Sequence, residues 1–127
     1  TNDLTQYTLA MDRDHPRLAS QADSFHPAVL RLIATTVQAA HAHGKWVGVC
    51  GALASETLAV PLLLGLGVDE LSVSVPLIPA IKARVRELDL VECQALAARI
   101  IDLEDAAQVR ECLQRQSVAA PSLVLEN

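Results

Sequence analysis

The sequence has few aromatic residues and few cysteines. Aromatic side chains make up 2% of its 127 residues, and the three cysteines, Cys50, Cys93 and Cys112, lie far apart. Their odd number and wide spacing exclude both a disulfide framework and a zinc site built from close cysteine pairs. Unpaired thiols are typical of a reducing compartment, so we expect a cytoplasmic protein.

Basic side chains are also scarce. Ten Lys and Arg residues face 15 Asp and Glu residues, for a formal net charge of −5. This balance argues against nucleic-acid binding, which usually needs a basic patch. No uncharged run approaches the roughly 18 apolar residues of a membrane span, so we expect no membrane partner. With 51% hydrophobic and 20% charged residues, the chain is also too apolar for a disordered segment.

A leader sequence is missing as well. The chain opens at Thr1, without an initiator Met and without the basic and apolar regions of a signal peptide. Its length is that of one domain or part of one. We therefore expect a piece of a longer protein.

Helical periodicity alternates with short β-branched runs, which is typical of βα units around a parallel sheet. The pattern predicts a buried strand over Trp46–Cys50 and a second strand over Glu70–Ser74. Helices are predicted over Pro27–His43, Ile78–Glu87, Asp89–Ile101 with Asp89 and Glu92 as a capping box, and Glu104–Gln114. Another helix is predicted over Glu56–Leu66 after an N-cap at Ser55, and it is expected to be kinked or to begin late because Pro61 lies inside it. From Ser117 the periodicity is lost, and coil or a docked extension is expected. Two strands do not make a stable open sheet, so the chain belongs to a larger α/β domain or buries its edge against another copy.

The opening segment Thr1–Tyr7 concentrates side-chain oxygens. Asp3 is a hard oxygen ligand that suits Mg²⁺, and Asn2 can supply a neutral oxygen or orient a phosphate. Arg13 carries a planar guanidinium that matches phosphate or carboxylate geometry. The alternative interpretation is a polar turn in which Asp3 caps a helix and Arg13 is solvated.

Cys50 ends the first predicted strand and is followed at once by Gly51. The carboxyl ends of parallel strands are where catalytic groups gather, and a thiol there can act as an acid or a nucleophile. The alternative is that Cys50 is a small buried hydrophobe, as most free cysteines are. Cys93 and Cys112 fall inside predicted helices and are expected to be structural.

The histidines and glycines do not form a recognisable site. His15, His26, His41 and His43 lack metal-ligand spacing, and His41 and His43 are expected to interact with the dipole at the end of their helix. No GxxxxGK[ST] or GxGxxG phosphate loop is present.

Three segments carry a family resemblance: TNDLTQYTLAMDR over 1–13, HGKWVGVCGALAS over 43–55, and LLLGLGVDELSVSVPLIPAIK over 62–82. They resemble the C-terminal part of enzyme I of the bacterial phosphoenolpyruvate:sugar phosphotransferase system and the related multiphosphoryl transfer proteins. Pyruvate phosphate dikinase and phosphoenolpyruvate (PEP) synthase share the TNDLTQ and CG motifs, but the YTLAMDR segment is closer to enzyme I. The segment after Gln116 matches no motif of the family.

The resemblance implies a fold and a division of the chain. The family's catalytic domain is a (β/α)₈ barrel, which needs about 250 residues. Residues 1–116 would therefore be the C-terminal fragment of a PEP-binding barrel domain, with two or three short parallel strands and several helices, and residues 117–127 a tail. Residues 46–50 would be the seventh strand and residues 70–74 the eighth.

The resemblance also implies roles for four residues. Asp3 would ligate Mg²⁺, and Asn2 would contact a phosphate. Arg13 would bind the transferring phosphoryl group or the phosphate of PEP. Cys50 would be the general acid that protonates the enolate carbon as pyruvate forms. The implied partners are PEP and pyruvate, an N-terminal phosphohistidine domain, an HPr-type phosphocarrier and a second copy of the chain; none of the four histidines here matches the phosphohistidine motif.

One departure from the family and two other functions remain open. Family members commonly read CGELA, whereas this chain has Ala52 in place of the glutamate, which puts the position and acidity of Cys50 in doubt. The family's other site residues would lie upstream of Thr1, so the isolated chain is expected to be inactive. It could instead be a non-catalytic dimerisation module, or a fragment of a dikinase or synthase relative.

Overall fold

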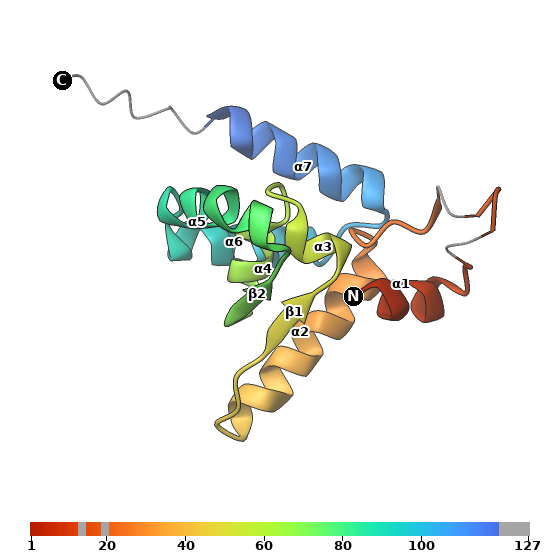
Figure 1. Ribbon diagram of the computed structural model, residues 1–127, viewed down its shortest axis with the longest axis horizontal. Coiled ribbons are helices and arrows are strands. Elements are labelled where there is room, and N and C mark those ends of the chain that lie inside the picture. The colour runs from red at the N-terminus through yellow and green to blue at the C-terminus, as the bar shows by residue number, and fades with distance from the viewer. Residues whose placement is uncertain (13–14, 19–20, 120–127) are drawn as a thin grey trace.

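The computed structural model describes residues 1–12, 15–18 and 21–119, and Figure 1 shows their arrangement. The elements are α1 (Asn2–Leu9), α2 (Pro27–Ala42), β1 (Gly48–Cys50), α3 (Ala52–Ser55), α4 (Val60–Gly65), β2 (Glu70–Ser72), the 3₁₀ helix η2 (Val75–Leu77), α5 (Ile78–Arg86), α6 (Leu90–Ile100) and α7 (Ala106–Ala119). Helices with short parallel strands confirm the α/β class. Within these described ranges, no helix is both long and apolar enough to span a membrane.

The two strands pair in parallel and are joined by a crossover through α3 and α4, as parallel strands require. Gly48 is in register with Glu70, and Cys50 with Ser72. Side chains alternate between the faces of a strand, so Val49 enters the core while Gly48 and Cys50 remain exposed.

The prediction of a buried strand over Trp46–Cys50 is therefore wrong in two respects. The strand begins at Gly48, and only its central residue is buried; Trp46 is 68% exposed. The physical reason is that the elements in the described part of the chain cover one face of the sheet. The second strand is also shorter than predicted, because it ends at Ser72 and η2 follows.

Helix α2 confirms the predicted helix at Pro27–His43 to within its cap residue. Pro27 stands in the first turn, where its missing N–H costs nothing, and His26 Nδ1 accepts a hydrogen bond from the backbone N–H of Ala28 at 3.1 Å. The apolar stripe of α2 packs into the core beside Val49 and Leu53. Its buried members are Val29, Leu30, Ile33, Ala34 and Val37.

The helix predicted over 56–66 begins late, as Pro61 indicated, but its predicted N-cap at Ser55 is wrong. The structure has two short helices, and Ser55 is the last residue of α3, where its Oγ donates to the Gly51 carbonyl at 3.4 Å. Pro61 explains the division, because proline is tolerated only in the first turn of a helix. Helix α4 accordingly begins at Val60.

Helix α6 follows its prediction and packs closely on α4. Asp89 Oδ1 accepts from the backbone N–H of Glu92 at 3.0 Å, as the capping pattern indicates. Gly65 of α4 lies so close to the Cys93 carbonyl that any Cβ at position 65 would overlap it. Cys93 is 2% exposed, and burial raises the pKa of its thiol, which confirms that it is structural.

Helix α7 is longer than predicted. It begins at Ala106 behind the Asp105 side chain, which accepts from the Gln108 N–H at 2.8 Å, and it continues to Ala119. The coil expected from Ser117 is therefore wrong for residues 117–119, while residues 120–127 lie outside the described residues. The division between 116 and 117 remains a prediction. Val109 and Leu113 anchor α7 to the core.

Candidate active site

The start of α1 binds the end of β1. The terminal ammonium nitrogen and Oγ1 of Thr1 both donate to the Cys50 carbonyl, at 3.0 and 2.8 Å. Asn2 Oδ1 accepts from the Ala52 N–H at 2.9 Å. These three hydrogen bonds are called the strand-end clasp below. They bring Asn2 and its neighbour Asp3 to the carboxyl end of the strand that carries Cys50.

Gly51 makes the strand-end clasp possible. Its φ is +95°, a conformation that favours glycine. A Cβ at this position would lie 2.8 Å from Asn2 Oδ1 and 2.9 Å from Thr1 Oγ1. Thr1 and Gly51 are site-forming residues that residue type alone did not identify, although the Cys50–Gly51 pair directly after a strand was a signal for Gly51.

Cys50 is exposed at the strand end, so the interpretation of it as a small buried hydrophobe is wrong. It lines a pocket of about 180 Å³ between β1, α1 and α2. The other lining residues are Thr1, Leu4, Ile33, Thr36, Val47, Gly48 and Val49. Cys50 thus lines a largely apolar pocket next to the strand-end clasp.

Asp3 is exposed in the first turn of α1, and Thr1 rather than Asp3 occupies the N-cap position. The alternative in which Asp3 is the cap is therefore wrong. Within residues 1–12, 15–18 and 21–119 no group of three or more His, Cys, Asp or Glu side chains could hold a metal ion. Mg²⁺, however, is usually held by one or two carboxylates together with substrate phosphates and water. Asp3 fits that role as a single protein ligand.

The other candidate residues are Arg13 and the histidine at the end of α2. Arg13 lies outside the described residues, and its role remains a prediction. His41, in the last turn of α2 as expected, has Nε2 2.8 Å from Asp69 Oδ2, which also accepts from the Val47 N–H at 2.8 Å. The hydrogen bond from His41 and that from Val47 lower the pKa of Asp69. These contacts join α2 to the loop before β2.

Thr5 holds Thr1, the first residue of the strand-end clasp, in place. It is 3% exposed, and its Oγ1 donates to the Thr1 carbonyl at 2.8 Å. The Thr5 N–H donates to the same carbonyl at 2.9 Å. Thr5 thereby fixes the first turn of α1, and with it the position of Thr1.

Comparison with known proteins identifies the family of this strand-end arrangement. Residues 1–90 match the family model described as PEP-utilising enzyme, PEP-binding domain. The chain belongs to this family.

Individual relatives are named more specifically than the family. It is 54% identical over 110 residues to a multiphosphoryl transfer protein of Xanthomonas campestris pv. campestris, covering 87% of the chain and 13% of the relative. A multiphosphoryl transfer protein of Rhodobacter capsulatus is 56% identical over the same length and share. The phosphoenolpyruvate-protein phosphotransferase of Bacillus subtilis is 40% identical over 109 residues, 86% of the chain and 19% of the relative. The resemblance to the enzyme I group is confirmed, and the chain spans less than a fifth of each of these relatives.

Proposed function

We propose that the chain is the C-terminal part of the PEP-binding catalytic domain of a phosphoenolpyruvate-protein phosphotransferase. Such an enzyme transfers the phosphoryl group of PEP to a protein histidine and releases pyruvate. The observation that carries the proposal is the strand-end clasp, which holds the Asn2 amide at the end of the strand that carries Cys50, with Asp3 next to Asn2 in the chain. The relatives' names support the reaction.

The exposed face of the sheet supports a barrel. Parallel sheets are normally covered on both faces, yet Gly48, Cys50, Glu70 and Ser72 are all exposed on one side of the β1–β2 pair. Helices packed on the other face and functional residues at the carboxyl strand ends are the features of a (β/α)₈ barrel. We infer that β1 and β2 are its seventh and eighth strands, with the others supplied by the rest of the protein.

Asp3 and Asn2 would face the phosphate of PEP. Mg²⁺ held by Asp3 would neutralise charge on the phosphate, where phosphoryl transfer gains most from positioning and electrostatic stabilisation. Because Asn2 Oδ1 already accepts from Ala52, the amide NH₂ is the group of Asn2 that donates to a phosphate oxygen. Arg13 would bind the transferring phosphoryl group through its planar guanidinium.

Cys50 would complete the reaction after the phosphoryl group has left. The P–O bond of PEP breaks as the histidine nitrogen bonds phosphorus, which leaves the enolate of pyruvate. The Cys50 thiol then gives its proton to the terminal enolate carbon, which becomes the methyl group of pyruvate, and water reprotonates the thiolate. An N-terminal phosphohistidine domain, an HPr-type phosphocarrier and a homodimer are the partners that this function requires or that its family implies.

The test measures pyruvate release and protein phosphorylation by the full-length protein with PEP and Mg²⁺. Asp3→Asn and Arg13→Ala are each expected to lower kcat by about 100-fold, the usual cost of losing one preorganised electrostatic contact. Arg115→Ala is the control, because Arg115 is exposed on α7 and pairs only with its neighbour Glu111 in the described contacts. Normal turnover by either site variant, or no pyruvate from the wild-type protein, would refute the proposed function.

A further inference from the structure

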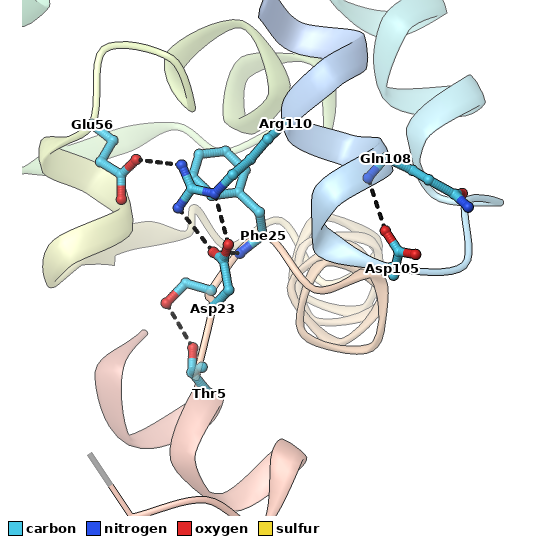
Figure 2. A network of polar contacts seen from close by, with 8 residues as sticks. Thr5, Asp23, Phe25, Glu56, Asp105, Gln108 and Arg110 are labelled. Atoms are coloured by element: carbon cyan, nitrogen blue, oxygen red, sulfur yellow. Dashed lines mark hydrogen bonds and ion pairs between the residues drawn. The ribbon is translucent and has the colours of Figure 1, made fainter. Parts of the chain in front are cut away.

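Arg110 of α7 contacts both Asp23, in the loop before α2, and Glu56, at the end of α3, as Figure 2 shows. Its Nε and Nη2 donate to the two carboxylate oxygens of Asp23, at 2.7 and 3.0 Å. Its Nη1 donates to Glu56 Oε2 at 3.3 Å. The guanidinium also lies over the Phe25 ring, 4.2 Å from its centroid. A bidentate ion pair and a cation–π contact hold the same side chain in one orientation.

The ion pair between Arg110 and Asp23 is partly buried and fully hydrogen-bonded on the Asp23 side. The two side chains are 35% and 25% exposed, and Asp23 Oδ1 also accepts from the Phe25 N–H at 3.0 Å. Burial alone would raise the pKa of Asp23, but the hydrogen bonds from Arg110 and Phe25 and the charge of Arg110 outweigh it and lower the pKa. The pair therefore orders the loop that precedes α2.

A chain of hydrogen bonds leads from this loop to the strand end. Ser24 Oγ lies 2.9 Å from Thr5 Oγ1. The Thr5 hydroxyl has one hydrogen, which it donates to the Thr1 carbonyl, so Ser24 is the donor in its contact with Thr5. Thr1 in turn donates to the Cys50 carbonyl. Ser24, next to Asp23, is thus linked through Thr5 and Thr1 to the strand that carries the Cys50 thiol.

The contact with Glu56 links Arg110 to the strand end through α3. Glu56 is the C-cap residue of α3, and its N–H donates to the Leu53 carbonyl at 3.2 Å. The same short helix begins at Ala52, whose N–H donates to Asn2. Arg110 therefore contacts both the loop before α2, through Asp23, and the C-terminal end of α3, through Glu56. The strand-end clasp joins the start of α1 to the start of α3.

We propose that Arg110 is a positioning residue for the PEP site. It touches no reacting atom; it sets the relative position of Asn2, Asp3 and Cys50 through Ser24–Thr5–Thr1 on one side and Glu56 on the other. Phosphoryl transfer is sensitive to misplacement of this kind, because an error of about 1 Å can cost about 100-fold in rate. The expected effect on the reaction rests on the proposed function, whereas the contacts of Arg110 do not depend on it.

Arg110→Lys in the full-length protein is the first variant. Lysine keeps the charge but loses the planar bidentate fork and its stacking on Phe25. We expect kcat for pyruvate formation to fall about tenfold while KM changes less than about twofold, since the reacting groups rather than the binding surface are displaced. Arg115→Lys, on the same helix, is the matched control and is expected to leave both values unchanged. A fall in thermal stability with normal kcat would refute the proposal.

The second experiment separates positioning from general stabilisation. In a Ser24→Ala/Glu56→Ala background both links are cut, so adding Arg110→Lys is expected to lower kcat by less than about twofold. A merely stabilising Arg110 would lower kcat by the same factor in both backgrounds, which would contradict the proposal.

The third measurement is amide hydrogen exchange of the same proteins, which needs no activity. Arg110→Lys is expected to speed exchange in segments 1–5 and 50–52 as well as in 21–26, and Arg115→Lys in none of them. Faster exchange confined to 21–26 and α7 would refute the positioning role. If the wild-type protein made no pyruvate from PEP, the proposed function would fail, whereas the exchange data would still decide whether Arg110 orders the strand end.

Discussion

Asn2 Oδ1 accepts the Ala52 N–H at 2.9 Å, a contact between residues 50 positions apart in the chain. It joins the first turn of α1 to the first residue of α3 across the Gly51 turn. The amide of Asn2 thus has two separable parts: an oxygen that holds the structure and an NH₂ that the proposed function assigns to the phosphate of PEP.

Substitutions at Asn2 separate these two parts. Asn2→Asp keeps the acceptor oxygen and loses the donor, so Ala52 should stay protected from exchange while the KM for PEP rises about tenfold, as expected for one hydrogen bond to a charged group. Asn2→Ala loses both the acceptor and the donor, and exchange at Ala52 should accelerate as well. Exchange at Ala52 and steady-state kinetics check this; equal protection of Ala52 in the two variants would contradict it.

Gly51→Ala is expected to open the strand-end clasp. With a φ of +95° and a ψ of −166°, Gly51 lies in a backbone region essentially restricted to glycine, which costs another residue about 1–3 kcal/mol, and the new Cβ would displace the Asn2 and Thr1 side chains. Gly44→Ala is the matched control, because Gly44 has a φ of +65° but nothing within 4 Å of the added carbon. Urea unfolding should show a larger loss of stability for Gly51→Ala, and only that variant should lose activity. Similar losses of stability in the two variants would mean that backbone strain alone, and not overlap with Asn2 and Thr1, destabilises the fold.

Cys50→Ser is expected to slow pyruvate formation by about 100-fold, the lower range for losing a general acid, with little change in PEP binding. Serine is similar in size but far less acidic. Cys112→Ser, at a half-buried position on α7, serves as the control and should keep normal kinetics. Single-turnover kinetics with separate detection of phosphohistidine and pyruvate check this. Weaker PEP binding with a normal rate of protonation would argue against the acid role.

The Arg110–Asp23 pair makes stability depend on pH. The pKa of Asp23 is lowered in the folded protein from its ordinary value of 3.8, so its stabilising contribution is complete well above pH 3.8 and is lost as pH falls through the lower folded-state pKa. Asp23→Asn should therefore be less stable than wild type at pH 7, and the difference should shrink below about pH 4. Urea unfolding at pH 7, 5 and 3 measures this difference. A difference that is constant over this range would mean that Asp23 does not stabilise the fold as a charge.

Local sequence signals predicted several elements well. The apolar stripe and Pro27 placed α2, and Asp89 with Glu92 placed the start of α6, because both depend on residues within one or two helical turns. Over 56–66 the same rules placed the late start of the helix, because proline stands only in a first turn, but they missed α3 and the position of Ser55 at its end.

The site was predictable in part. Residue type and the family resemblance singled out Asn2, Asp3 and Cys50, and the structure brings them together. Arg13 remains a prediction outside the described residues. Arg110 was missed because nothing near it in the sequence distinguishes it from other helical arginines; its partner Asp23 is 87 residues away.

The sequence by itself determined the α/β class, the main helices and the residue types at the strand end, because periodicity, capping and side-chain chemistry act over a few neighbouring residues. Only the tertiary structure decided that Thr1 and Asn2 close on the Cys50–Ala52 turn and that Arg110 holds the segments on either side. Such contacts join residues many positions apart, and their geometry exists only once the core has packed and the Gly51 turn has brought the two segments within hydrogen-bonding distance.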